Sequence, residues 1–207
     1  FVSDVHYGTV QSTKLVKDSI LKMNNLKPDI VVLGGDIVDE RTTKDSMEEI
    51  FEELGKINST YGTYYIFGNH DRQPYTTDYV NGNRTFTDSD LNQSIEKNKI
   101  KILNDAKVTI NNDIVLVGRS DAEWENSVNR MDVNEIFNES DLSKYIVVLD
   151  HQPVEYEKNA QEGVDLQLSG HTHGGQLFPY GMIYDLTGRL NYGEYEIGDM
   201  KQIVSYL

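Results

Sequence analysis

The sequence lacks cysteine and is poor in basic residues. Without cysteine, disulfide bridges, thiolate zinc sites and cysteine nucleophiles are excluded. Nineteen Lys and Arg residues against 34 Asp and Glu residues give a formal net charge of −15, which repels nucleic-acid backbones and anionic membrane surfaces. No apolar run approaches the roughly 18 residues of a membrane-spanning helix. Nucleic acid is therefore a disfavoured partner, and membrane attachment is expected only through segments absent from this chain.

The length and composition indicate one folded domain. The chain has 207 residues, of which 38% are hydrophobic and 26% are charged, and a chain of this length buries about two-thirds of its unfolded surface. It opens within a β-type run, Phe1–Asp4, and closes on the apolar run Ile203–Leu207. We therefore expect residues 1–207 to form a single domain excised from a longer chain at both ends.

The first third alternates strand-type runs with segments of helical periodicity. Helices are expected at residues 13–25 and 44–57, and strands at residues 1–2, 29–33 and 64–67. This βαβαβ order predicts a parallel sheet covered by helices. Residues 72–94 are polar and poor in aliphatic side chains, which favours a long surface loop.

Shorter apolar runs in the later half predict a second sheet. The expected strands cover residues 101–103, 107–110, 114–117, 146–149, 166–168, 176–178 and 203–204. Asn111, Asn112 and Asp113 separate two of these runs as a hairpin turn. The predicted fold class is therefore α/β, with a mixed or antiparallel second sheet packed on the first and helices outside.

All five histidines lie in or beside turns that follow predicted strands: His6, His70, His151, His171 and His173. Carboxylates and an amide share these turns: Asp4, Asp36, Asp39, Asn69 and Asp71. Because the carboxyl ends of parallel strands converge on one crevice, these side chains are expected to meet. Imidazole, carboxylate and amide ligands suit a divalent metal such as Mn, Fe or Zn. They are too many for one tetrahedral ion and fit two ions that share a bridging carboxylate.

The same residues fall into five short blocks in chain order. The blocks are D-x-H from Asp4, G-D-x-x-D from Gly35, G-N-H-D from Gly68, the lone His151, and G-H-x-H from Gly170. Together they resemble the calcineurin-like metallophosphoesterase family, and GHTHGGQ at residues 170–176 is similar to a bacterial branch whose members are often membrane-anchored or exported. The resemblance implies a four-layer α/β/β/α sandwich with two central mixed sheets. Residues 1–207 would then be one metallophosphoesterase catalytic domain.

The resemblance also implies a role for each residue. One divalent ion would take Asp4, His6 and His173, a second would take Asn69, His151 and His171, and Asp36 would bridge them. A hydroxide between the ions would attack phosphorus, and manganese is the ion favoured for activity. His70 would stabilise the transition state or protonate the leaving oxygen, with Asp39 as its carboxylate partner and Asp71 as the alternative.

The implied activity is binuclear metal-dependent hydrolysis of phosphodiester or pyrophosphate bonds in small nucleotides or lipid-linked phosphates. One alternative is a catalytically idle module that keeps its metals and binds a phosphorylated ligand. Another is a nuclease of the same superfamily, which the acidic composition disfavours. Protein Ser/Thr phosphatases carry Asp-Arg-Gly where Asp39, Glu40 and Arg41 stand here, so protein phosphatase activity is disfavoured. We expect a soluble domain of a membrane-anchored or exported bacterial protein.

Arg119, Asp121 and Trp124 carry a weaker signal. The run Gly118–Asp121 is similar to a turn near the site in that family, and a surface loop with one packed tryptophan is the equal alternative. Gly170, Gly174 and Gly175 are expected to shape a turn rather than to take part in catalysis.

Overall fold

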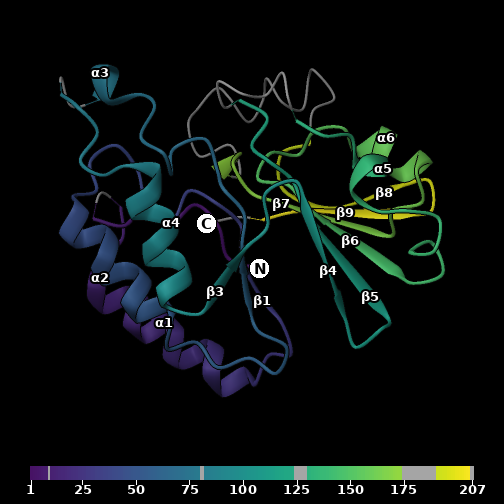
Figure 1. The fold of residues 1–207 in the computed structure, drawn as a ribbon, viewed down its shortest axis with the longest axis horizontal. Helices are drawn as coiled ribbons and strands as arrows, with labels where there is room; N and C mark the ends of the chain where they lie inside the picture. Colours follow the sequence, from purple (N-terminus) through teal and green to yellow (C-terminus); the bar gives the residue numbers. More distant parts are fainter. Residues whose placement is uncertain (9, 80–81, 124–129, 174–189, 206–207) are drawn as a thin grey trace.

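The chain folds around two β-sheets, which a computed structural model shows for residues 1–8, 10–79, 82–123, 130–173 and 190–205 (Figure 1). The smaller sheet is parallel, in the order β1–β2–β3, with strands Val31–Leu33, Thr63–Tyr65 and Ile100–Ile102. Val2 extends this sheet through one parallel bridge to Leu33. The N-terminal run therefore joins the smaller sheet, as the βαβαβ pattern predicts.

The larger sheet is mixed, with six strands in the order β4–β5–β6–β7–β9–β8. In that order the strands are Ala106–Ile110, Ile114–Gly118, Tyr145–Leu149, Leu166–Ser169, Met200–Val204 and Gly193–Ile197. The outer pairs β4–β5 and β8–β9 are antiparallel, and the inner pairs are parallel. The predicted hairpin turn at residues 111–113 is confirmed, because it connects β4 to β5.

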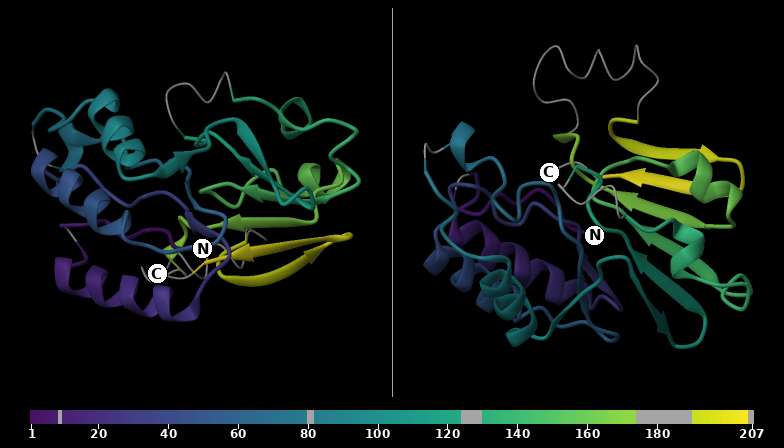
Figure 2. Two further views of the ribbon diagram at one scale, coloured as in Figure 1. Left: turned by 60° about the horizontal axis from the view of Figure 1, so that its bottom comes forward. Right: turned by 45° about the horizontal axis from the view of Figure 1, so that its top comes forward.

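Helices cover the outer faces of both sheets (Figures 1 and 2). The smaller sheet carries α1 (Thr13–Leu26), α2 (Lys44–Leu54) and α4 (Asp88–Lys97), whereas the larger sheet carries α5 (Val133–Ile136) and α6 (Tyr156–Gln161). A short helix, α3 (Thr76–Tyr79), precedes α4. Within the part of the chain that the structure describes, no helix combines the length and the apolar character needed to cross a membrane.

Alternation along the strands sends neighbouring side chains into different layers. Val31 and Leu33 pack under the helices of the smaller sheet, whereas Val32 between them faces the other sheet. In β6, Val148 packs under the helices of the larger sheet, and Val147 packs between the sheets. The three resulting cores fill the three interfaces of a four-layer α/β/β/α sandwich, which confirms the expected fold class.

The three helices on the smaller sheet each begin at a hydroxyl side chain that accepts a hydrogen bond from the first turn. Ser12 caps α1, Thr43 caps α2 and Thr87 caps α4. The loop predicted over residues 72–94 is wrong where α4 begins. Leu91 and Ile95 lie one turn apart in this helix and are fully buried against the smaller sheet, and their burial outweighs the polarity of the rest of the segment.

The position of β3 also differs from the prediction. Residues 101–103 are expected in the second sheet, but Ile100–Ile102 pairs in parallel with β2 in the smaller one. Parallel neighbours need a long crossover, and α4 supplies the helix of that crossover. The strand expected at residues 176–178 lies outside the described residues.

Candidate metal centre

The predicted ligands lie on turns that follow strands of both sheets. From the smaller sheet come Asp4 and His6 after the Val2 bridge, Asp36 after β1, and Asn69 after β2. From the larger sheet come His151 after β6, and His171 and His173 after β7. The site therefore lies where the carboxyl ends of strands from the two sheets meet, as the order of the motifs predicts.

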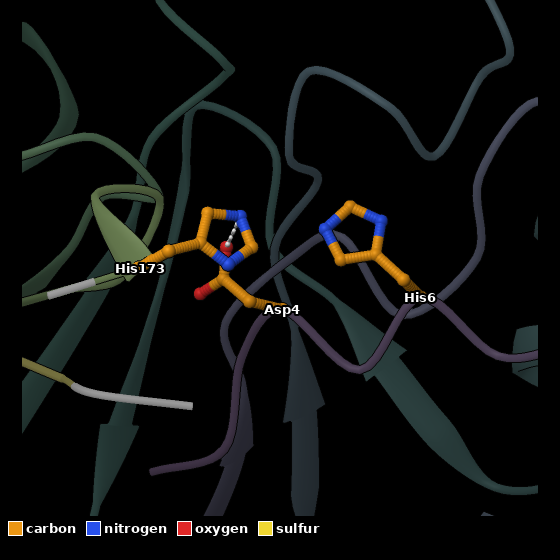
Figure 3. A group of neighbouring side chains, drawn as sticks. All are labelled: Asp4, His6 and His173. Carbon is orange, nitrogen blue, oxygen red and sulfur yellow. Dashed lines mark ion pairs between the residues drawn. The ribbon is translucent and has the colours of Figure 1, made fainter. Parts of the chain in front are cut away.

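Asp4, His6 and His173 form a first group of ligands, in which one donor atom from each lies within 4.8 Å of the others (Figure 3). Oδ1 of Asp4 lies 3.7 Å from Nε2 of His173. The rings of His6 and His173 stack with their centroids 5.4 Å apart. Asp4 and His6 are buried, and His173 is half-buried. The structure thus brings together the three residues predicted to hold one ion.

Asp36, His151 and His171 form a second group by the same criterion. Oδ2 of Asp36 lies 3.1 Å from Nε2 of His151 and 3.9 Å from Nε2 of His6, so this carboxylate oxygen faces both groups. Oδ1 of Asn69 lies 3.0 Å from Nδ1 of His171, which adds the predicted amide ligand. Asp36 therefore occupies the position expected of a bridging ligand.

The chemistry of this donor set fits two divalent ions. Nδ1 of His151 lies 2.8 Å from the carbonyl oxygen of Gly34; its hydrogen bond fixes the ring and directs Nε2 toward Asp36. Burial lowers the pKa of His151, but the charge of Asp36 outweighs it and raises this pKa well above its ordinary value. The position therefore favours a positive charge, which a metal ion supplies. Burial and the neighbouring His151 lower the pKa of His171 to about 4, which keeps this imidazole neutral and able to ligate.

The backbone of the ligand turns is strained. Asp4, His6, Asp36, His171 and His173 all have positive φ angles, between 45° and 69°. This left-handed region costs free energy for residues other than glycine, and such residues persist where the surrounding structure fixes them. The concentration of strain on five predicted ligands agrees with a functional site.

Glycines allow the ligand turns to approach one another. A Cβ at Gly68 would lie 2.3 Å from Oδ1 of Asp36, and a Cβ at Gly170 would lie 2.4 Å from Oδ2 of Asp4. Either side chain would displace a ligand carboxylate, which supports the structural role expected for Gly170. Gly174 and Gly175 lie outside the described residues.

His70 lies beside the first group and is held by a carboxylate that the sequence analysis does not single out. Its Nδ1 lies 2.8 Å from Oε2 of Glu40, whereas Oδ2 of Asp39 lies 3.4 Å from Nδ1 of His6, a predicted ligand. The assignment of Asp39 as the partner of His70 is therefore corrected to Glu40. Burial lowers the pKa of His70, but the hydrogen bond to Glu40 and the charge of Asp36 outweigh it and raise the pKa to about 9.

Asp71, the alternative partner for His70, joins the turns after β1 and β2. Its buried carboxylate accepts hydrogen bonds from the backbone N–H groups of Asp36, Ile37, Val38 and Gly68, at 2.7 to 3.2 Å. Hydrogen bonds of this kind to a charged acceptor are about twice as strong as neutral ones. Asp71 therefore positions Asp36, the predicted bridging ligand.

We expect Asp71→Asn to lower the free energy of unfolding by about 2–4 kcal/mol, because the amide NH₂ faces donors and leaves buried N–H groups unpaired. Denaturant unfolding in the presence of a chelator measures this loss without a contribution from bound metal. Asp18→Asn, on the exposed face of α1, is the matched control. A change within 0.5 kcal/mol of that control, the range of ordinary surface substitutions, would contradict the assigned role.

Arg119 and Asp121 follow β5 and are both buried, which rules out the surface-loop alternative for them. Nη2 of Arg119 donates a hydrogen bond to the carbonyl oxygen of Met131 at 2.6 Å and lies 3.0 Å from Oε2 of Glu155. Burial raises the pKa of Asp121 to about 6. Trp124 lies outside the described residues.

Comparison with known proteins agrees with this geometry. A family model described as calcineurin-like phosphoesterase matches residues 1–175. The chain belongs to the calcineurin-like phosphoesterase family. Membership makes it a metallophosphoesterase, a class of hydrolases that act on phosphoric esters with divalent metal ions.

This calcineurin-like phosphoesterase is similar to longer proteins. It is 29% identical over 205 residues to an uncharacterized metallophosphoesterase of Campylobacter jejuni. The alignment covers 98% of this chain and 50% of that protein. It is also 29% identical over 203 residues to a transmembrane protein with metallophosphoesterase domain of Danio rerio, covering 96% of this chain and 45% of that protein. The chain thus spans about half the length of these relatives.

Solved structures show the same fold. The crystal structure of a dimetal phosphatase from Danio rerio matches with a TM-score of 0.56 at 13% identity, covering 99% of this chain and 85% of that one. At this identity the likeness concerns the fold alone. It agrees with the two-sheet sandwich that this calcineurin-like phosphoesterase adopts.

Proposed function

We propose that this chain is the catalytic domain of a binuclear metal-dependent phosphohydrolase that cleaves phosphodiester or pyrophosphate bonds. The observation that carries the proposal is the position of Asp36, whose Oδ2 faces His6 in one ligand group and His151 in the other. A carboxylate shared in this way suits a pair of ions. When bound, two divalent ions, for which we propose manganese, would lower the pKa of water and neutralise the charge of the phosphate.

His70 supplies the proton donor of the proposed reaction. Nδ1 lies 2.8 Å from Oε2 of Glu40, and the proposal assigns to Nε2 the donation of a proton to the leaving oxygen. A pKa raised to about 9 keeps the ring protonated at neutral pH. The ring lies 5.3 Å from that of His6, measured between centroids, so the donor is beside the first ligand group.

A cavity of about 220 Å³ gives access to this part of the site. It is lined by His6, His70, His173, Arg41, Val10, Asp39 and Glu40. Its size and the acidic composition of the chain support small phosphorylated molecules, nucleotides or lipid-linked phosphates, as substrates in preference to nucleic acid. The relatives described as transmembrane proteins support placing the domain in a membrane-anchored or exported protein.

The proposal predicts manganese-dependent hydrolysis of bis-p-nitrophenyl phosphate, faster than that of the p-nitrophenyl monoester and abolished by a chelator. Release of p-nitrophenolate measures both rates. Elemental analysis of the same samples gives the number of ions per chain. No hydrolysis of either ester by protein that holds two ions would overturn the proposal and favour a metal-containing binding module, whereas cleavage of DNA with manganese would favour a nuclease.

A further inference from the structure

A second, larger cavity lies beside His171, one of the predicted metal ligands. Its volume is about 580 Å³. It is lined by Glu123, Gln152, Pro153, Val154, Glu155, Tyr156, Glu157, Lys158, His171, Thr172 and Leu190. Most of these residues follow His151 along the turn into α6, so the same turn carries a metal ligand and the wall of this cavity. None of them takes part in the reaction described above except His171.

The charged side chains around this cavity differ in whether a described residue of opposite charge lies close to them. Glu155 lies 3.0 Å from Nη2 of Arg119 and 3.1 Å from Nη2 of Arg130, and Lys158 pairs with Asp132 outside the cavity lining. Glu123 and Glu157 form no ion pair within the described ranges of the chain, and both are exposed. Among the described residues, the cavity therefore presents two carboxylates, those of Glu123 and Glu157, without a cationic partner.

Gln152 adds a buried polar side chain to the wall of this cavity. The residue is only 4% exposed, and its side-chain Nε2 has no hydrogen-bond partner among the described residues. A buried amide without a partner costs free energy, and native structures rarely leave one unpaired. Nε2 itself is buried, so a rotation of the side chain toward the cavity would let an oxygen atom of a bound molecule accept this hydrogen bond.

The remaining wall is apolar and suits a short alkyl chain. Pro153, Val154 and the buried Leu190 contribute hydrocarbon surface, and the half-buried Tyr156 contributes a ring. A ligand that fits all of these features has an anionic end for the metal centre, a short hydrocarbon linker and a cationic end for the glutamates. Amino-alcohol phosphates have this arrangement, whereas groups that carry a second phosphate or a carboxylate place like charges together.

We propose that this cavity binds the group esterified to the phosphate and selects a group that bears a protonated amine over one that bears a further anion. Glu123 and Glu157 provide the selection, and Gln152 Nε2 donates a hydrogen bond to an oxygen of the bound molecule. The inference rests on the proposed function, since the phosphate must bind at the metal centre. It narrows the substrate class to phosphoesters of amino alcohols.

Binding of three phosphonates of matched length tests the inference without any turnover, because a C–P bond is not hydrolysed. The probes are 3-aminopropylphosphonate, butylphosphonate and 4-phosphonobutyrate, titrated by calorimetry into the manganese-loaded chain. We expect the amine to bind about fivefold more tightly than the alkyl probe, and the carboxylate about fivefold more weakly, as exposed charge pairs allow. Both differences should shrink as salt is added.

Variants separate a local effect from that of the net charge. The double variant Glu123→Gln and Glu157→Gln should abolish the preference for the amine. The double variant Glu48→Gln and Glu96→Gln removes the same amount of charge from exposed positions on α2 and α4. This variant should keep the preference for the amine. Gln152→Leu should weaken the binding of all three probes by a common factor of about five, which corresponds to the loss of one hydrogen bond.

Equal affinities for the three probes, no binding of any of them, or an equal loss of preference in both double variants would overturn the inference. These outcomes are independent of the nitrophenyl ester assay. A chain that hydrolyses bis-p-nitrophenyl phosphate but does not discriminate among the phosphonates retains the proposed function and loses this selectivity. A chain that discriminates among the phosphonates but hydrolyses neither nitrophenyl ester loses the proposed function and retains the cavity's preference.

Discussion

Asp36→Ala is expected to remove bound metal from both ligand groups and to lower the rate of phosphodiester hydrolysis by about a thousandfold or more. Oδ2 of this residue faces Nε2 of His151 at 3.1 Å and Nε2 of His6 at 3.9 Å. Without the carboxylate, neither group keeps its shared ligand. Elemental analysis after dialysis and the rate with bis-p-nitrophenyl phosphate measure the two effects.

Asp36→Asn is the matched control, because Oδ1 of Asp36 also accepts a hydrogen bond from the backbone N–H of His70 at 2.8 Å. The asparagine variant keeps an oxygen for this hydrogen bond and removes the charge. We expect it to lose metal and activity as the alanine variant does, with an unchanged circular dichroism spectrum. Full metal content and activity in either variant would contradict a bridging role.

The second large effect is expected for His70. His70→Ala should lower kcat by about 10²–10⁴-fold, the usual contribution of a general acid, while both ions remain bound. Elemental analysis and kcat measured on one preparation distinguish this result from a loss of ligands. Normal turnover in the variant would show that His70 donates no proton, and simultaneous loss of metal would assign it to the metal centre instead.

The partner of His70 determines how activity depends on pH. A general acid must be protonated, so activity is lost as the pH rises through its pKa. Glu40 raises the pKa of His70, so Glu40→Gln should lower that pKa and move the alkaline limb of the kcat profile to lower pH. Asp39→Asn is the control: because Asp39 lies against His6, it should weaken metal binding and leave the alkaline limb in place. The opposite pattern would restore Asp39 as the partner.

That the proposed metal ligands would lie close together was predictable, because each stands directly after a strand. A strand end fixes the place of the next few residues, and strands of one sheet end at the same edge. This reasoning predicted that Asp4, Asp36 and His151 would meet, although they are far apart in the chain. The assignment of Asp39 to His70 came instead from the resemblance to the family, which did not point to Glu40. The side chain of Glu40 contacts His70, and this contact between loop residues could not be predicted from the sequence.

The fold was predicted where the hydrophobic pattern is strong and missed where the pattern is weak. The buried run Val31–Leu33 and the helical stripe of Met47, Ile50 and Phe51 both mark their elements clearly. α4 buries mainly Leu91 and Ile95 among polar residues, so its average polarity favoured a loop. The capping box of Thr87 and Asp90 was the available signal. Because α4 was not predicted, the crossover that places β3 beside β2 was not predicted either.

The ligand groups take residues from distant parts of the chain. Asp4 and His173 belong to one group, and most of the polypeptide lies between them. An ion held by both would close a very long loop, which in the chain-entropy description restricts the unfolded state strongly. In a chain without cysteine, such an ion would restrain the fold as a long-range disulfide does. A chelator would then lower the stability of this fold, as a reductant lowers that of a disulfide-bonded protein.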